Sequence, residues 1–329
     1  MSSSAIPHIG DIRSAQVRIA PYVVRTPLLE YPQLNARVGG RVLIKPEVLQ
    51  RTGSFKPRGA FNRLLALSEE ERRLGVVAFS SGNHAQAVAF AARTLGLAAI
   101  IVMPMDAPAV KRAATVNLGA RVIDYDRVRD DREAIAREVS ERTGAIVVPA
   151  FDDPAIIAGQ GTAGAEIAED CARLGIRPDQ FLAPVSGGGL IAGCSLAIHA
   201  DFPQTRCVTV EPEGFDDHRR SLLAGVRVQN AALSGSLCDA LLAPMPGELT
   251  FAINSAHLSG ALTVSDEDVL KAMSYAAREL KLTVEPGGAV ALAALLSGAA
   301  ALKGETAVIM LSGGNADPQM LMRALAQSV

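Results

Sequence analysis

The sequence has 329 residues, of which 49% are apolar and 20% charged, and its formal net charge is −2. A chain of this length and composition forms one large or two medium globular domains and is not intrinsically disordered. The small net charge, the lack of a long basic run and the 4% aromatic content argue against nucleic-acid binding. No uninterrupted apolar stretch is long enough to span a membrane, so no membrane partner is expected.

The four cysteines are scattered, and none forms a C-x-x-C pair (Cys171, Cys194, Cys207 and Cys238). This spacing argues against a zinc site and against a thioredoxin-type motif. Scattered thiols in a chain of this size indicate a reducing compartment. The first residues, MSSSAIPHIGDIR, lack the basic and apolar pattern of a secretory signal. We therefore expect a cytoplasmic protein.

Short runs rich in Val and Ile alternate with longer Ala-rich segments along the chain. Strands are predicted at 41–47, 76–80, 98–104, 121–125, 145–149, 181–185, 206–212 and 306–313. Helical spacing of apolar residues predicts helices between them, including 154–173, 190–200, 265–282 and 286–297. This alternation predicts an α/β fold with parallel sheets that are covered by helices on both faces.

Two departures from the alternation indicate how the chain is divided. Residues 213–264 are rich in Gly, Pro, Ser and Leu and have poor periodicity, so we expect loops with short helices there. Four closely spaced strand–helix units between 74 and 152 indicate a small domain. We expect it to be inserted into a larger domain formed by residues 1–73 and 153–329.

A run of three glycines follows the strand predicted at 181–185, in the sequence SGGGL (186–190). Consecutive glycines allow backbone N–H groups to surround an anion, and a helix amino terminus adds partial positive charge. The sequence matches neither a Walker A loop nor G-x-G-x-x-G. A phosphate site is the favoured interpretation, and a tight turn that needs positive φ values is the alternative.

Two more strand ends carry small polar residues, in SSGNHAQ (80–86) and LSGGN (311–315). In open α/β sheets, ligands bind beyond the carboxyl ends of the strands. The first segment could hold a carboxylate, or it could simply cap a helix through Ser81 or Asn83. In the second, Ser312 could contact a ring nitrogen or lie in a plain turn.

Lys56 lies in the sequence SFKPRGA (54–60), where Ser54 is a candidate helix cap and Pro57 fits a first helical turn. The positive end of the helix dipole should lower the pKa of an amine at that position. A lysine with a lowered pKa is the usual nucleophile toward a carbonyl cofactor. The alternative is a solvated surface lysine.

Together these segments resemble the fold-type II pyridoxal-phosphate enzymes, and most of all the threonine/serine dehydratase and serine racemase group. The matching segments are SFKPRGA, SSGNHAQ, AGQGT (158–162), SGGGLIAG, VEPE (210–213), VEPGGA (284–289) and LSGGN. They run from about residue 20 to 320, so the resemblance covers nearly the whole chain. It implies the two-domain, tryptophan synthase β-like fold and pyridoxal 5'-phosphate as the cofactor.

The resemblance also implies roles for particular residues. Lys56 would carry the cofactor covalently and later remove the Cα proton, and Ser81 would act on the opposite face. Other cofactor contacts would come from Phe55, Asn83, Gly187, Gly188, Gly189, Leu190 and Ser312. The substrate carboxylate would lie against Ser81, Asn83 and His84.

The activity implied by the resemblance is loss of water from a β-hydroxy amino acid, which gives a 2-keto acid and ammonia. Serine racemisation and dehydration of threo-3-hydroxyaspartate are the enzymatic alternatives, and a non-catalytic ligand-binding protein on the same fold is a third. Hydroxyaspartate would need a cation for its second carboxylate, for which Arg58 and Arg132 are candidates. The segment 236–251 differs from the racemase pattern, so substrate preference stays open.

An acidic segment, VEPEGFDD (210–217), follows the strand predicted at 206–212. By the resemblance, Glu211, Asp217 and the Phe215 carbonyl would bind Mg²⁺, Mn²⁺ or Ca²⁺, which prefer such oxygen ligands. The alternative is a solvated acidic turn that caps the following helix. The resemblance further implies a homodimer or a homotetramer.

Overall fold

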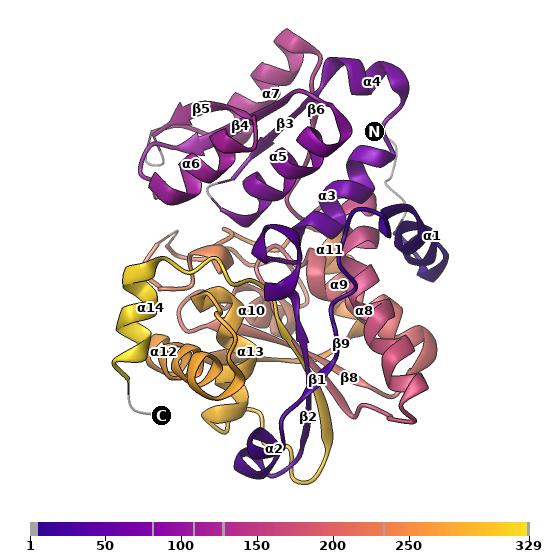
Figure 1. Cartoon of the computed structure of the whole chain (residues 1–329), viewed down its shortest axis with the longest axis vertical. Coiled ribbons are helices and arrows are strands. Elements are labelled where there is room, and N and C mark those ends of the chain that lie inside the picture. Colours follow the sequence, from indigo (N-terminus) through magenta and orange to yellow (C-terminus); the bar gives the residue numbers. More distant parts are fainter. Residues whose placement is uncertain (1–5, 81, 108, 127–128, 233, 328–329) are drawn as a thin grey trace.

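The computed structural model describes residues 6–80, 82–107, 109–126, 129–232 and 234–327. Two sheets lie one above the other along the long direction of the molecule, each with helices packed against it (Figure 1). Helix α3 (Lys56–Leu65) lies between the two, as the chain passes from the larger sheet to the smaller one. The predicted α/β architecture with parallel sheets is therefore confirmed.

The larger sheet has the strand order β1-β2-β10-β7-β8-β9, and only β1 runs antiparallel to its neighbour. Its strands are β1 (Leu29–Glu30), β2 (Arg41–Pro46), β7 (Gln180–Pro184), β8 (Arg206–Pro212), β9 (Leu258–Val264) and β10 (Thr306–Leu311). Alternate residues of β10 enter different cores. Ala307, Ile309 and Leu311 pack with the helices α12 (Asp266–Tyr275) and α13 (Pro286–Leu296). Val308 and Met310 pack with α8 (Pro154–Arg173) and α9 (Gly189–Asp201), so the sheet is buried on both faces.

The smaller sheet has the order β5-β4-β3-β6, with all pairs parallel. Its strands are β3 (Val76–Phe79), β4 (Ala99–Pro104), β5 (Arg121–Tyr125) and β6 (Ile146–Val147). The helices of this region are α4 (Glu69–Leu74), α5 (Asn83–Leu95), α6 (Ala109–Asn117) and α7 (Arg132–Thr143). All four strands fall within the segment 74–152, for which an inserted small domain is predicted. The boundaries of that domain stay a prediction.

The other elements lie around these two sheets and connect them. They are α1 (Ile9–Ile19), α2 (Pro32–Val38), η1 (Glu47–Leu49), η2 (Arg51–Gly53), α10 (Asp217–Ala224), η3 (Asp239–Leu241), α11 (Glu248–His257), the π-helix η4 (Ala276–Leu280) and α14 (Pro318–Leu325). Within the described ranges, no helix is long and apolar enough to cross a membrane.

The prediction of loops and short helices at 213–264 is wrong for its last part, where α11 leads directly into the seven-residue strand β9. The sequence of β9, LSGALTV, contains Gly and Ser and lies at the edge of the sheet, where most of its residues are only partly buried. It therefore lacks the continuous apolar run that marks the inner strands.

The four cysteines are all free and buried. Burial raises the pKa of the Cys207 and Cys238 thiols to about 12, and that of Cys171 to about 11. Thiols with such high pKa values stay protonated and react slowly. They pack as small apolar groups in the cores of the protein.

Candidate active site

Lys56 is the first residue of α3, and the preceding residues fix its position against the larger sheet. Ser54 forms an isolated antiparallel bridge with Gly313, and the Phe55 N–H donates to the Ser312 carbonyl over 3.1 Å. Both partners follow the carboxyl end of β10 directly. The helix therefore starts beside the strand end where a ligand is expected.

The predicted Ser54 cap is wrong, although Pro57 does occupy the first helical turn. Phe55 is the residue before the helix, and no side chain caps it. The Ser54 hydroxyl is buried and has no hydrogen-bond partner among the described residues. Its backbone is extended because it pairs with Gly313, and this long-range pairing prevails over the local capping preference.

Lys56 as a whole residue is only partly buried, but its Nζ is surrounded by protein atoms and donates to the Ala150 carbonyl over 2.8 Å. Burial lowers its pKa to about 8, because a charged ammonium loses its solvation there. The direction agrees with the sequence-based expectation, but the cause is burial rather than the helix dipole. Nζ also lies 5.1 Å from the centre of the Phe55 ring. With this pKa about a tenth of the amine is uncharged at pH 7, far more than for an ordinary lysine, and the uncharged form is the nucleophile.

The glycine loop connects β7 to α9 and has the geometry of an anion site. Gly188 has a φ of 99°, which only glycine adopts without strain, and α9 begins at Gly189. A Cβ on Gly187 would lie 2.2 Å from the Phe151 ring. Leu190 is the second residue of the helix, so N–H groups of the loop and first turn have no acceptor within the helix. Such free N–H groups at a helix start suit a phosphate.

The glycine loop and Lys56 meet at two consecutive residues after β6. The Ala150 carbonyl accepts the hydrogen bond from Lys56, and the ring of Phe151 lies over Gly187. Distant segments at 56, 150 and 187 are therefore adjacent in space. An aldehyde cofactor with a phosphate tail needs this juxtaposition of an amine and an anion cradle.

Asn83 is held by a buried polar group that the sequence analysis missed. Its Nδ2 donates to Glu285 Oε1, and Asn315 Nδ2 donates to Asn83 Oδ1 over 2.7 Å. Burial raises the pKa of Glu285 to about 7. Glu285 belongs to the segment VEPGGA, which contributes to the family resemblance but predicts no role for the glutamate. Its 202-residue separation from Asn83 left no local signal for the pair.

His84 lies in the first turn of α5, where Nε2 is 2.9 Å from the Val148 carbonyl. A carbonyl only accepts, so Nε2 carries the proton, and the buried Nδ1 is left without a partner in the described part of the chain. Burial, reinforced by the nearby Lys56, lowers the pKa of His84 to about 3. The ring is therefore neutral, and any carboxylate would meet a neutral imidazole. Gly82 precedes this helix, so a cap from Asn83 is wrong; Ser81 lies outside the described residues.

The acidic segment forms a buried cluster of Glu211, Asp217 and His218, with one ligand atom of each within 4.8 Å of the others. Both Glu211 oxygens accept backbone N–H groups, from His218 and Arg219, each over 2.8 Å. Asp217 Oδ1 accepts from Asn230, whereas Oδ2 is buried without a partner among the residues described. The alternative interpretation is wrong about solvation, because these carboxylates are buried, but Glu211 does cap the first turn of α10 as that interpretation expects. Phe215 is buried in the same turn, and His218 was not predicted.

The two cations considered for a second substrate carboxylate differ in availability. Arg58 is fully buried and paired with Glu47 and Glu166, so the prediction that it faces a substrate is wrong. The Arg132 guanidinium lies 5.5 Å from the centre of the Phe79 ring and pairs with no carboxylate among the described residues. Phe79 ends β3, immediately before the SSGNHAQ segment.

The sequence model of the protein family described as pyridoxal-phosphate dependent enzyme matches residues 19–313 of the chain. The chain belongs to this family. A threonine deaminase structure from T.th. superposes with a TM-score of 0.90 at 45% identity, covering 94% of this chain and 99% of that one. The maize serine racemase structure gives 0.91 at 37% identity, with 98% and 97% covered.

Among relatives known by sequence, the L-threo-3-hydroxyaspartate ammonia-lyase of Saccharomyces cerevisiae is 41% identical over 95% of this chain and 94% of the relative. This pyridoxal-phosphate-dependent enzyme is thus similar over nearly its whole length to a threonine deaminase, a serine racemase and an L-threo-3-hydroxyaspartate ammonia-lyase. The family establishes the cofactor class, and the site described above fits it: a buried amine, an adjacent glycine cradle and a strand-end serine.

Proposed function

We propose that the protein is an ammonia-lyase that removes water from a β-hydroxy amino acid and yields a 2-keto acid and ammonia. The observation that carries this proposal is the buried Lys56 amine, with a pKa of about 8, beside the glycine cradle. The relatives named as ammonia-lyases and deaminases support it.

When bound, pyridoxal phosphate withdraws electrons from Cα of an attached amino acid. Lys56 would hold the cofactor and then accept the Cα proton, since its uncharged amine is available near neutral pH. Loss of this proton and of the β-hydroxyl group amounts to loss of one water. Hydrolysis of the resulting unsaturated amine then releases ammonia and the keto acid.

The other residues would bind and orient the reactants. N–H groups of Gly187, Gly188, Gly189 and Leu190 would hold the phosphate, with Ser312 at the ring nitrogen and Phe55 against the ring. Asn83, already fixed by Glu285 and Asn315, would donate to the ring oxygen. Ser81 would complete the carboxylate site, and His84 would line it and offer its backbone N–H in the first turn of α5, because its free ring nitrogen Nδ1 cannot donate.

Lys56→Ala tests the assignment against keto-acid release from L-serine, L-threonine and both 3-hydroxyaspartates. We expect turnover to fall below about 10⁻³ of the wild-type rate while the melting temperature stays close to wild type. Substantial elimination by a folded Lys56→Ala variant would refute the role of Lys56. A wild-type protein that binds the cofactor but releases no keto acid would favour the non-catalytic alternative.

A second candidate substrate is a 3-hydroxyaspartate, which Arg132 favours. Its guanidinium is partly buried, pairs with no described carboxylate and lies against the residue that ends β3. A substrate with a second carboxylate would supply the missing anion. Arg132→Gln should lower kcat/KM at least tenfold for hydroxyaspartate and less than threefold for threonine. Equal losses on both substrates would exclude this role.

Serine racemisation, which depends on Ser81, is the remaining alternative and is tested by chiral analysis of the same reactions.

We also propose that the acidic cluster binds Mg²⁺, Mn²⁺ or Ca²⁺ through Glu211, Asp217 and the Phe215 carbonyl. Asp217 Oδ2 supports this, because it is buried, accepts no hydrogen bond among the described residues and has only the neutral His218 ring nearby, at 3.9 Å, which leaves its charge uncompensated without a cation. Chelation should lower the melting temperature, and Mg²⁺ should restore it in the wild type but not in Asp217→Asn. No change on chelation would exclude the ion.

A homodimer or homotetramer remains our expectation, to be checked by light scattering.

A further inference from the structure

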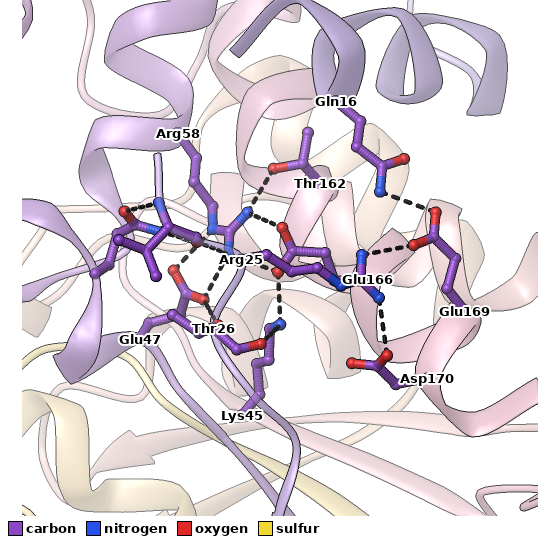
Figure 2. A network of polar contacts seen from close by, with 12 residues as sticks. Gln16, Arg25, Thr26, Lys45, Glu47, Arg58, Thr162, Glu166, Glu169 and Asp170 are labelled. Atoms are coloured by element: carbon purple, nitrogen blue, oxygen red, sulfur yellow. Dashed lines mark hydrogen bonds and ion pairs between the residues drawn. The ribbon is translucent and has the colours of Figure 1, made fainter. Parts of the chain in front are cut away.

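A buried network of ion pairs lies on the side of α3 opposite to the proposed cofactor site. Figure 2 shows Lys45, Glu47, Arg58 and Glu166 at its centre, with the other members around them. These four charged side chains are at most 5% exposed, and their charges sum to zero. A buried network of this kind gives little net stability relative to apolar packing, so stability alone does not account for it and a geometric role is indicated.

Arg58 is the member that joins this network to the helix of Lys56. Its Nε and Nη2 donate to the two oxygens of Glu47 over 2.8 and 2.9 Å. Its Nη1 and Nη2 donate to the two oxygens of Glu166, each over 2.8 Å, and Nη1 also reaches Thr162 Oγ1 over 3.1 Å. Two bidentate carboxylates fix the guanidinium plane in direction as well as position.

The two carboxylates that Arg58 contacts belong to separate elements. Glu47 follows β2, and Glu166 lies on α8. Lys45 Nζ connects Glu166 Oε2 to the Thr26 carbonyl, over 2.6 and 2.7 Å, and Thr26 Oγ1 donates to Glu47 Oε1. The first turn of α3 is thus fixed to the larger sheet, to α8 and to the segment before β1.

Close packing of α3 on α8 allows Arg58 on the first helix to contact Glu166 on the second. A Cβ on Gly159 would lie 2.6 Å from the Arg58 carbonyl, and one on Gly59 would lie 2.4 Å from Gln160 Nε2. The Gly59 N–H donates to Gln160 Oε1 over 3.1 Å. The helices therefore touch at glycines, which leaves the first turn little freedom to tilt.

Each residue of an α-helix is rotated by about 100° from the one before it, so residues two apart point in nearly opposite directions. Lys56 and Arg58 consequently lie on nearly opposite faces of the same turn, one facing Ala150 and the other the network. We propose that Arg58 is a positioning residue: its two carboxylate pairs set the rotation of the first turn of α3 and thereby aim the Lys56 amine at the cofactor aldehyde.

Arg58→Lys tests this inference because it keeps the charge but cannot hold two carboxylates in a plane. Arg25→Lys is the matched control: Arg25 pairs with Glu169 and Asp170 at the exposed edge of the same network and has no contact with α3 through these pairs. Both variants are purified with saturating pyridoxal phosphate. The fraction of Lys56 trapped by borohydride is measured by peptide mass spectrometry, beside the rate of cofactor loss on dilution, kcat and KM.

We expect Arg58→Lys to lose cofactor at least tenfold faster, with less Lys56 trapped and kcat lowered about 10- to 100-fold at a KM within threefold. Arg25→Lys should stay within twofold in every measurement. A folded Arg58→Lys protein with wild-type trapping and kcat would overturn the inference. If Arg58→Lys does not fold, Glu47→Gln decides in the same way, since it weakens one of the two pairs.

The trapping and cofactor-loss measurements do not require any lyase activity. If the wild type traps cofactor on Lys56 but releases no keto acid, the proposed function fails and the positioning role is still tested. If the wild type is active and Arg58→Lys equals it, only the positioning role fails.

Discussion

Lys56 combines burial with a hydrogen bond that does not need a charge. The Ala150 carbonyl can accept from an amine as well as from an ammonium, and no carboxylate among the described residues pairs with Lys56, so the loss of solvation dominates and the pKa falls to about 8. An exposed lysine such as Lys271, whose pKa is raised by Glu267, lacks this property.

We predict that cofactor-free protein captures pyridoxal phosphate on Lys56 with a rate that rises through a midpoint near pH 8. The neutral amine is the reactive form, and it becomes the major form above the pKa. Borohydride trapping after short pulses, with the Lys271 peptide as internal control, measures the rate. A midpoint near 10.5 for Lys56, the ordinary value for a lysine, would show that burial does not affect its ionisation.

Glu285 provides a second prediction at this scale. Burial raises its pKa from 4.5 in the unfolded chain to about 7, so folding is favoured by protonation. The contribution is fully present below pH 4.5 and is lost as the pH rises through 7, a change of about 3 kcal/mol by linkage. Relative to wild type, Glu285→Gln should therefore be more stable at about pH 8 than at about pH 5 by about this amount.

Urea unfolding of Glu285→Gln and wild type at the two pH values gives this difference directly. The glutamine keeps an oxygen that can accept from Asn83. A stability difference between the two proteins that does not vary with pH would mean that Glu285 is ionised in both states.

Single residues show where sequence reasoning succeeds and where it stops. Lys56 and the three glycines can be identified because their neighbours in the chain set their chemistry. Glu285 and the pairing of Arg58 with Glu166 escape it, because the partners are 202 and 108 residues away and no local pattern marks them. Ser81 falls outside the described residues, so its predicted role stays a prediction.

At the scale of elements, the turn before α9 requires glycine at position 188 for two reasons: its positive φ and the close packing of its neighbours. A Cβ on Gly188 would lie 2.8 Å from Asn254 Nδ2 and 2.9 Å from His218 Nε2. The turn after α8 offers a contrast: Gly175 also has a positive φ, of 66°, but a Cβ there would meet nothing within 4 Å.

Gly175→Ala should cost only the backbone strain, about 1–2 kcal/mol. Gly188→Ala should cost at least about 2 kcal/mol more, because the methyl group crowds buried polar atoms, and it should also weaken cofactor binding. Thermal unfolding and cofactor titration of both variants measure these differences. Equal losses of stability would show that the pocket around Gly188 can relax.

Inner strands are predictable because residues buried on both faces give continuous apolar runs. The range 206–212 agrees with the inner strand β8 residue for residue, and 154–173 agrees with the buried helix α8. The edge strand β9 and the start of α3 are not predicted correctly. Their conformations come from pairing with β8 and with Gly313, which lie far away in the sequence.

In the whole molecule, Lys111 and Asp239 join the helices of the smaller sheet to the larger part. Lys111 Nζ lies 2.7 Å from Asp239 Oδ2, between α6 and η3, and 3.8 Å from where a Cβ on Gly82 would be. The lysine side chain is 13% exposed. We therefore predict that this ion pair helps to hold the two parts together around a bound substrate.

Lys111→Met and Asp239→Asn should each raise KM about fivefold, which corresponds to about 1 kcal/mol for a partly exposed pair. The double variant should raise it no further, because the same interaction is lost once. Steady-state kinetics of the four proteins give the coupling. Additive effects of the two substitutions would show that the residues act independently.

The buried, unreactive thiols make the protein a convenient background for spectroscopic labels. With Cys171, Cys194, Cys207 and Cys238 shielded, one new cysteine placed on an exposed residue of each sheet region would react selectively with a maleimide dye or a nitroxide. The native cysteines need not be replaced. Distances between such labels would then follow, in solution and in real time, how far the two parts of the molecule move when an amino acid enters.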